Sequence, residues 1–180
     1  MRVIAGTFKG LHLASPTWSG LRPTSDKLRE TLFNVIAARV PGARVLDAYA
    51  GTGAIGIEAL SRGAAHVTFV DRDPRALALI EGNLRRCGVH DRYVIIRSRL
   101  GERSHSLPPK AFDLAVLDPP YDETDLAAAI GVAAPLMTPG GLLVLEHARR
   151  QLAPDAAAGM ARTRDLRSGD SSLAFYEVSI

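Results

Sequence analysis

A glycine-rich segment near residue 50 is the first part of the sequence whose residue types could bind a small molecule. Gly51, Gly53 and Gly56 follow the spacing G-x-G-x-x-G, and Asp71 comes 20 residues after the first of them. Glycines allow a tight turn and a close approach of a ligand to the backbone, and an acidic side chain at that distance can accept the hydroxyls of a ribose. The spacing therefore predicts a site for a nucleoside-containing ligand.

The charge beside this loop bears on which nucleoside ligand fits. Asp47 stands just before the glycines, where its carboxylate would repel the pyrophosphate of a dinucleotide but attract a cation. S-adenosylmethionine carries an ammonium and a sulfonium group and has no phosphate, so electrostatics favour this ligand. A dehydrogenase stays open as an alternative, and binding of a nicotinamide dinucleotide in a titration would revive it.

A second chemical motif, Asp118-Pro119-Pro120-Tyr121, follows an apolar run. The side chain of Asp118 and the carbonyl of Pro119, which the next proline stiffens, could hold the N–H groups of an exocyclic amine on a base. This would aim the nitrogen lone pair at a methyl donor, and the same oxygens would stabilise the developing positive charge. Tyr121 could stack on a base taken out of its helix. The motif predicts the catalytic site of an amino-methyltransferase.

The elements around the two motifs alternate between strand and helix. This alternation implies parallel pairing, while the last two strands are joined by a turn too short for a crossover and must be antiparallel. We predict an α/β fold, a Rossmann-like sheet of seven mostly parallel strands with an antiparallel C-terminal hairpin and both motifs at its carboxyl edge. The expected strands are 44–48, 66–70, 93–97, 112–117, 142–146, 161–166 and 173–178, and the expected helices are 24–41, 54–62, 74–87 and 123–134.

Length and composition exclude several classes of protein. The 180 residues, 47% of them apolar and 23% charged, suit one globular domain of about 150 residues with a small appendage. No apolar run reaches the ~18–20 residues of a membrane span and no signal peptide is recognisable, so we expect a cytoplasmic protein. The single cysteine, Cys87, and the scattered histidines give no metal-ligand spacing, and no metal is expected.

The net charge of +3 is unevenly distributed, because residues 1–46 carry +5. Nineteen of the 22 basic residues are arginine, whose guanidinium binds phosphate in two places at once. A basic front end suggests a polyanionic partner, although a positive face that only keeps the protein in solution is equally compatible with the charge alone. In the same region, β-forming residues from Arg2 to Leu13, interrupted by Gly6 and Gly10, predict a small hairpin.

Four segments of the sequence are characteristic when taken together. They are R-P-T at 22–24, R-E-x-L-F-N at 29–34, the stretch 47–64 around the glycine loop, and D-P-P-Y at 118–121. Together they resemble the RsmD family, bacterial methyltransferases that modify the guanine N2 amine of small-subunit ribosomal RNA with S-adenosylmethionine. The D-P-P-Y motif is shared with DNA amino-methyltransferases, whereas the first two segments are more specific. The likeness extends from about Arg2 to Tyr176.

The resemblance implies roles for particular residues. Asp47, Gly51 and Gly53 would border the methionine part of S-adenosylmethionine, Asp71 would hold the ribose, and the N-terminal hairpin would touch RNA. Where relatives usually carry Asp or Asn for the adenine amino group, this sequence has Ser98, a weaker acceptor. The expected site residues are Asp118, Pro119, Pro120 and Tyr121 for catalysis, Asp47, Tyr49, Gly51, Gly53, Asp71, Arg72 and Ser98 for the cofactor, and Arg2, Lys9, Arg22, Thr24 and Arg29 for RNA.

The predicted organisation is an RNA-contacting extension at residues 1–22 and a methyltransferase domain at residues 23–180. We expect a monomer whose partner is small-subunit (16S) ribosomal RNA or an assembling 30S particle. Because no sizeable target-recognition domain is present, the RNA would be chosen by its shape or by an assembly intermediate. Two rivals stay open: a DNA adenine or cytosine amino-methyltransferase, and a non-catalytic ribosome-assembly factor with this fold.

Overall fold

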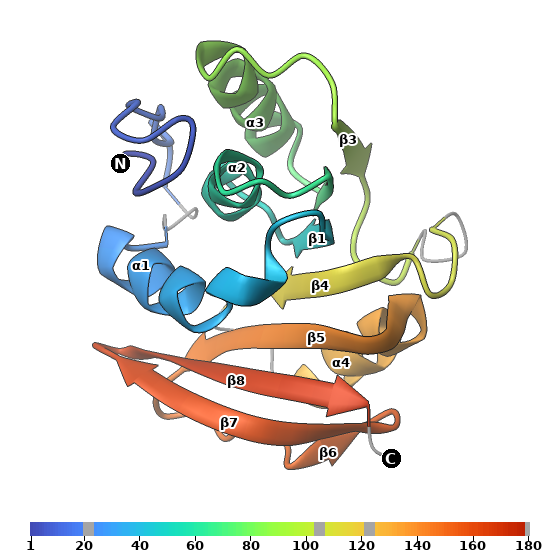
Figure 1. Cartoon of the computed structure of the whole chain (residues 1–180). Coiled ribbons are helices and arrows are strands. Elements are labelled where there is room, and N and C mark those ends of the chain that lie inside the picture. Colours follow the sequence, from blue (N-terminus) through green and yellow to red (C-terminus); the bar gives the residue numbers. More distant parts are fainter. Residues whose placement is uncertain (20–23, 103–106, 121–124, 179–180) are drawn as a thin grey trace.

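A computed structural model describes residues 1–19, 24–102, 107–120 and 125–178 of the chain. The strands in these ranges are β1 (Arg44–Ala48), β2 (His66–Asp71), β3 (Tyr93–Arg97), β4 (Phe112–Leu117), β5 (Met137–Ala148), β6 (Ala156–Ala157), β7 (Met160–Ser168) and β8 (Ser171–Val178). They form one mixed sheet in the order β3-β2-β1-β4-β5-β8-β7-β6 (Figure 1). The first five pair in parallel, and β8, β7 and β6 continue the sheet antiparallel.

Three of the α-helices in the described residues begin after a side chain that caps them. Ser25, Asp73 and Asp125 each accept a hydrogen bond from a backbone N–H of the first helical turn, which satisfies a donor that the helix itself cannot pair. The helices are α1 (Asp26–Val35), α2 (Ala54–Ser61), α3 (Pro74–Arg86) and α4 (Leu126–Ala133), with short 3₁₀ turns at Ala37–Arg39 and Ala134–Leu136. Among the described residues, no helix is long and apolar enough to cross a bilayer.

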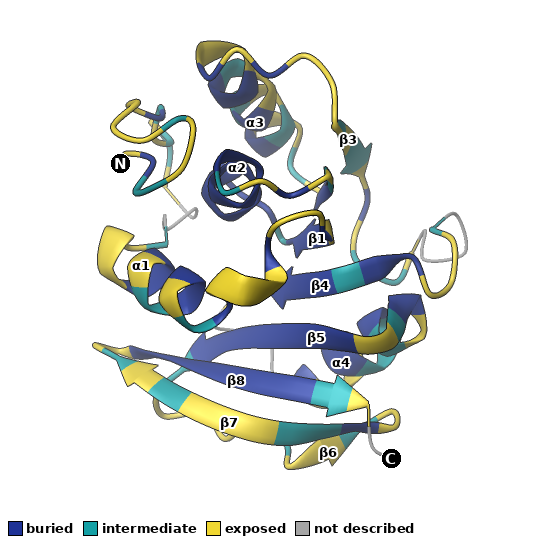
Figure 2. Cartoon of the chain, viewed as in Figure 1, coloured by how far each residue is buried: buried dark blue, intermediate teal, exposed yellow. Residues whose placement is uncertain are grey.

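The two faces of the sheet are covered by different helices. Side chains of α1, α2 and α3 share one buried cluster with alternate strand residues such as Val45, Phe69 and Val116. The intervening strand residues, including Leu46 and Leu117, pack with α4 in a second cluster. Figure 2 shows the consequence, since β1, β4, β5 and α2 are buried along nearly their whole length while β7 is largely exposed.

The sheet reverses its direction of winding between β1 and β4. From β1 the chain proceeds outward to β2 and β3, and it then returns to place β4 on the other side of β1. In sheets of this kind a crevice opens at the carboxyl ends of the two strands that flank such a point. The glycine loop follows β1 and the D-P-P segment follows β4, so both predicted motifs start at this crevice.

Most predicted elements are confirmed, but some bounds and the number of strands differ. The first helix, expected to run to residue 41, ends at Val35 and is followed by the 3₁₀ turn Ala37–Arg39. β5 begins at Met137 rather than at residue 142, because the Pro139-Gly140-Gly141 stretch is absorbed as an irregularity where the pairing with β4 shifts register. The sheet has eight strands over the described residues instead of seven. The additional strand, β6, is a two-residue pairing at the exposed edge within an alanine-rich segment.

The N-terminal residues fold back as the expected hairpin, although its ladder is short. Arg2 and His12 form an isolated antiparallel bridge, and the N–H of Gly10 donates to the carbonyl of Val3. Val3 and Leu13 are buried in the same cluster as α1 and α2, so this segment packs on the main core. The proposed domain boundary between residues 22 and 23 lies outside the described residues.

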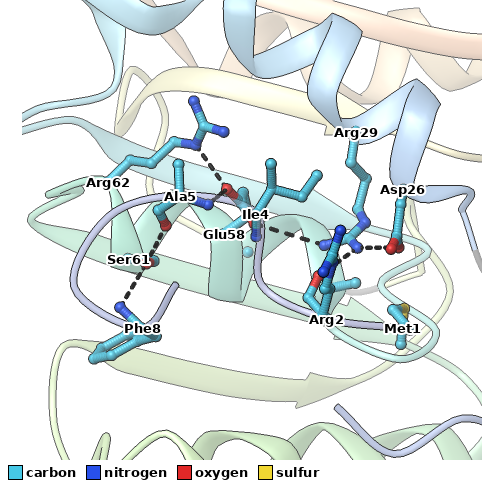
Figure 3. A network of polar contacts seen from close by, with 12 residues as sticks. Met1, Arg2, Ile4, Ala5, Phe8, Asp26, Arg29, Glu58, Ser61 and Arg62 are labelled. Atoms are coloured by element: carbon cyan, nitrogen blue, oxygen red, sulfur yellow. Dashed lines mark hydrogen bonds and ion pairs between the residues drawn. The ribbon is translucent and has the colours of Figure 1, made fainter. Parts of the chain in front are cut away.

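A buried carboxylate on α2 fixes the hairpin to the helices (Figure 3). Glu58 has no exposed surface, and its two oxygens accept the backbone N–H groups of Ile4 and Ala5 at 2.8 and 3.0 Å. The same carboxylate lies 2.7 Å from the guanidinium of Arg62 and 3.6 Å from that of Arg29. These contacts balance the charge of a side chain that would otherwise be very costly to bury.

Close backbone packing adds a second attachment next to Glu58. The carbonyl of Ser61 accepts the N–H of Thr7, and its hydroxyl accepts the N–H of Phe8 and donates to the carbonyl of Ala5. A Cβ placed on Gly6 would lie 1.9 Å from the Ser61 carbonyl oxygen, and the φ of Gly6 is +82°. Only glycine allows the hairpin to approach α2 this closely.

We expect the substitution Glu58→Gln to lower the free energy of unfolding by about 3–5 kcal/mol, because it leaves two guanidinium groups without their buried counter-charge. Urea denaturation of the variant and the wild type measures this difference. The matched control is Glu81→Gln, which removes an exposed ion pair with Arg85 one turn along α3 and should cost only about 0.3–0.5 kcal/mol. Equal effects of the two substitutions would contradict the structural role given to Glu58.

Candidate active site

A cleft of about 940 Å³ opens at the carboxyl ends of β1, β2, β4 and β5. Its walls come from the glycine loop, the residues after β2, β3 and β4, the start of α1 and the turn between β7 and β8. This volume lies within the range of pockets that hold drug-sized ligands. Two of its polar side chains, Asp118 and Asp47, come from the two predicted motifs, so the fold brings those motifs to one site.

Four acidic side chains share one face of the sheet at this cleft. Leu46, Val70, Leu117 and Leu145 all pack with α4 on the opposite face. Because successive side chains of a strand alternate between faces, the next residue in each case projects toward α1, α2 and α3. These next residues are Asp47, Asp71, Asp118 and Glu146, and all four line the cleft.

Asp47 lies beneath the glycine loop and is 1% exposed. One of its oxygens accepts the N–H of Gly56 in the first turns of α2 at 2.8 Å. Burial and the nearby negative charge of Asp71 nevertheless raise the pKa of Asp47 to about 8, and the Gly56 hydrogen bond only partly offsets them. A cationic group bound beside Asp47 would favour its charged form.

The loop between β1 and α2 adopts backbone conformations that suit close approach of a ligand. Gly51 and Gly53 have φ values of +56° and +75°, and Tyr49 has a φ of +61°, which is uncommon for a residue with a side chain. A Cβ on Gly53 would come within 3.1 Å of Ile80, so the loop is pressed against α3. Such strain is typical of ligand-binding loops that the surrounding structure holds in place.

Asp71 joins the glycine loop to the end of β2. Its two oxygens accept the N–H groups of Gly51 and Asp73 at 2.8 and 2.9 Å, which leaves further lone pairs for a hydroxyl-bearing ligand. Ser98 is 8% exposed and donates its hydroxyl to the carbonyl of Arg99 at 2.9 Å, so its oxygen can still accept a bond. Arg72 is exposed at the rim of the cleft.

Asp118 lies in the half of the cleft that the D-P-P motif forms. It accepts a hydrogen bond from the hydroxyl of Thr24 at 3.2 Å and lies beside the carboxyl group of Glu146. Burial and the charge of Glu146 raise the pKa of Asp118 well above its usual value, while the Thr24 hydroxyl opposes this shift. Pro119 is buried and Pro120 is exposed at the mouth of the cleft.

The structure corrects part of the expected RNA surface. Arg29 has no exposed surface, and its guanidinium bonds to the Arg2 carbonyl and Asp26, so the expectation that it contacts RNA is wrong for this structure (Figure 3). Thr24 lines the cleft and bonds to Asp118 instead of standing on an exposed basic face. The side chains of Arg2 and Lys9 are exposed.

Two expected site residues lie outside the described residues. They are Arg22, expected to bind RNA, and Tyr121, the last residue of the D-P-P-Y motif. Glu146, by contrast, was not predicted. It stands in the strand next to β4 in the sheet but 28 residues later in the chain, so only the strand order brings it beside Asp118. In the part of the chain that the structure describes, no group of three His, Cys, Asp or Glu could hold a metal ion.

The donor set of the cleft fits a cationic nucleoside cofactor. Carboxylates line it at both motifs, Asp71 and Ser98 have acceptor capacity for hydroxyl and amino groups, and the glycine loop lets a ligand approach the backbone. A phosphate-bearing ligand would meet the negative charge of Asp71 near the start of α2, where a pyrophosphate is normally held. It would also oppose the charged form of Asp47, whereas a bound cation favours that form. The residues present therefore fit S-adenosylmethionine better than a dinucleotide.

Known proteins resemble this chain over two thirds or more of its length. A protein of Bacillus subtilis named "Putative rRNA methyltransferase YlbH" is 35% identical, with 98% of each chain covered. The "Ribosomal RNA small subunit methyltransferase D" of Haemophilus influenzae is 37% identical over 123 residues, which are 67% of this chain and 64% of that protein. Among solved structures, "Putative methyltransferase yhhF" from Escherichia coli superimposes with a TM-score of 0.83 at 29% identity, covering 99% of this chain and 98% of that one.

The profile of one protein family, described as Conserved hypothetical protein 95, matches residues 1–177. That match includes the hairpin, the glycine loop, the D-P-P-Y motif and the C-terminal strands, so it spans every element that builds the cleft. The chain therefore belongs to the Conserved hypothetical protein 95 family, the RsmD family that its sequence motifs resemble.

Proposed function

We propose that this protein methylates the exocyclic N2 amine of a guanine in small-subunit ribosomal RNA with S-adenosylmethionine as the methyl donor. The observation that carries the proposal is the joint position of the glycine loop with Asp47 and of Asp118-Pro119-Pro120 at the walls of one cleft. The names of the relatives from B. subtilis and H. influenzae support rRNA, and small-subunit rRNA in the second case, as the substrate. The guanine N2 position is the finer part of the proposal and comes from the family resemblance.

The glycine-loop half of the cleft would bind the cofactor. Asp47, Tyr49, Gly51 and Gly53 would surround its methionine part, Asp71 and Arg72 its ribose, and Ser98 its adenine amino group. When bound, S-adenosylmethionine supplies a methyl group on a positively charged sulfur. The buried carboxylate of Asp47 would favour the cationic end of this molecule and orient it within the cleft.

The D-P-P half of the cleft would hold the amine that receives the methyl group. Asp118 and the carbonyl of Pro119 would accept its N–H groups, which directs the nitrogen lone pair toward the cofactor half of the cleft. Pro120 fixes the backbone that presents this carbonyl. The N–H groups of the amine would favour the charged form of Asp118, whose oxygens then stabilise the positive charge that develops on nitrogen. Stacking of Tyr121 on the base stays a prediction.

The N-terminal hairpin would contribute to the RNA surface. Met1 touches the hydroxyl of Thr52 in the glycine loop, and Asn83 of α3 bonds both to Ala14 and to the carbonyl of Thr52. The hairpin, with its exposed Arg2 and Lys9 side chains, therefore borders the cleft. Basic side chains in this position would hold RNA phosphates and orient the strand without reading its sequence.

We expect labelled methyl from S-adenosylmethionine to enter unmodified small-subunit particles or their protein-free RNA and to be recovered as N2-methylguanine. The substitution Asp118→Ala should lower the rate about 10²–10³-fold, because it removes an acceptor that acts on charge developing at the amine. Duplex DNA is offered in parallel, and calorimetry verifies that the variant still binds the cofactor.

The other outcomes of this transfer assay identify the rivals. Label in DNA alone would favour a DNA amino-methyltransferase. No label on any substrate, with the cofactor bound and with the cellular role of the protein intact in the Asp118→Ala strain, would favour a non-catalytic assembly factor. Either result would contradict the proposed function.

Replacing Arg2 and Lys9 together by alanine should weaken RNA binding and reduce its salt dependence. Two lost phosphate contacts should lower the magnitude of the slope of log K against log salt concentration by about 1.4, at ~0.7 per contact for a single strand. Filter binding at several salt concentrations measures the slope. Lys110→Ala is the control, since this exposed lysine precedes β4 at the edge of the sheet opposite the cleft. A slope unchanged by the double substitution would exclude the hairpin contact.

Binding of S-adenosylmethionine should release a proton from Asp47. With a pKa of about 8, this carboxyl is largely protonated in the free protein at pH 6.5, and a bound cation favours its charged form. At that pH the amino group of the cofactor is itself protonated. Calorimetry in buffers of different ionisation enthalpy measures the proton count. On binding the cofactor, the wild-type protein should release close to one proton more than the variant Asp47→Asn. The control variant Asp91→Asn, which changes an exposed residue, should behave like the wild type. Wild-type binding without proton release would contradict this assignment.

A further inference from the structure

Glu146 is a buried acid in the sheet that the amine-binding role of the D-P-P motif does not require. It is 5% exposed, lines the cleft near the end of β5, and stands directly after Leu145, whose partner in the parallel register is Leu117. Asp118 follows Leu117 in the same way, so the two carboxyl groups lie side by side on one face of the sheet. Both face the same part of the cleft.

This pairing is costly, and the core packing does not explain it. Around Glu146, β5 contributes the buried residues Leu143, Val144 and Leu145 to the core, and an apolar side chain would continue this pattern. A second carboxylate beside Asp118 instead adds like-charge repulsion at a buried position of the sheet. The arrangement is useful when a ligand brings several N–H donors to the same place, because each carboxylate then gains hydrogen bonds that offset its burial.

The edge of the target base determines how many donors it brings. Adenine, cytosine and guanine all carry an exocyclic amine, and enzymes that act on a flipped base read this Watson–Crick edge. Beside the amine, guanine has a ring N1–H donor, whereas adenine and cytosine have a ring nitrogen with a lone pair. A carboxylate next to the amine site would therefore accept a hydrogen bond from guanine and repel the lone pair of the other two bases.

We propose that Glu146 selects guanine by accepting its N1–H while Asp118 and Pro119 hold the 2-amino group. This assignment rests on the proposed function and adds to it the residue that distinguishes guanine from the other amino-bearing bases. A carboxylate beside N1 disfavours an analogue with a lone pair there, because the hydrogen bond to N1–H is lost and two acceptors then face each other.

The test replaces the target guanosine, once mapped by the transfer assay, with 2-aminopurine riboside by splinted ligation of the RNA. This analogue keeps the 2-amino group but has a lone pair at N1. Wild-type protein should methylate it at least about tenfold more slowly than guanine, as expected when a charged acceptor loses its donor. Glu146→Gln keeps an acceptor oxygen for N1–H but loses the negative charge, so it should lower the rate on guanine severalfold, and its amide can donate to N1 of the analogue. The ratio of analogue to guanine rates should therefore rise at least about tenfold in this variant.

Glu177→Gln is the matched control. The side chain of Glu177 is 39% exposed and pairs with Arg39. Glu177 stands opposite Leu142, four residues before Glu146 along β5, so the rate ratio of this variant should equal that of the wild type. An unchanged ratio in Glu146→Gln, or an unchanged rate on guanine, would overturn the assignment of Glu146 while leaving the proposed function intact. Equal rates of the wild-type protein on guanine and on the analogue would also overturn the assignment of Glu146, before any variant is tested. Wild-type protein that methylates no guanine would instead overturn the proposed function, and the inference with it.

Discussion

The mutual repulsion of carboxylates at one edge of a buried sheet is the constraint on which the rest of this structure depends. Asp47, Asp71, Asp118 and Glu146 lie at or just after the carboxyl ends of four parallel strands and share one face. In a protein interior such a group is tolerated only with donors close by. The chain supplies some of them, from the backbone at Gly51 and Gly56 and from the Thr24 hydroxyl. A cationic cofactor and an amine-bearing base would supply further donors and positive charge. The acidic edge would therefore favour the binding of these ligands.

The other elements hold this edge in position. Thr24, just before the N-cap of α1, bonds to Asp118 from a segment far away in the sequence. The helix α2 carries both the N–H that Asp47 accepts and the carboxylate of Glu58 that holds the hairpin. One helix of eight residues thus connects the cofactor side of the cleft to the proposed RNA surface. Because α2 is buried along its entire length, close packing holds both ends of this connection in place.

The sequence predicts the fold well where local signals are strong. The bounds of β1, β3 and β4 agree with the structure, because short apolar runs between turn residues define them. β6 was missed because a two-residue pairing in an alanine-rich segment has no periodicity to detect. The sequence predicts too late a start for β5, because its glycines are typical of a loop, whereas the pairing with β4 absorbs them.

Site residues that lie within one sequence motif were predictable from the sequence. Residues that only the order of strands in the sheet brings together were harder to predict. The glycine loop and D-P-P segment carry recognisable spacings, but Glu146 depends on the strand order. Arg29 was assigned to RNA from its motif. Its position three and four residues before Leu32 and Phe33, on the buried face of α1, was an available signal of burial. Its buried partner Glu58 is distant in the sequence, and only the packing of α1 near α2 reveals it.

A crystal structure with bound S-adenosylmethionine would test the central claim most directly, because that claim concerns how the acidic edge orients a cation. The account predicts the amino group of the cofactor at Asp47, its ribose hydroxyls at Asp71 and its methyl group directed toward Asp118 and Pro119. A cofactor bound outside the cleft, or within it with the methyl group directed away from Asp118, would contradict the account.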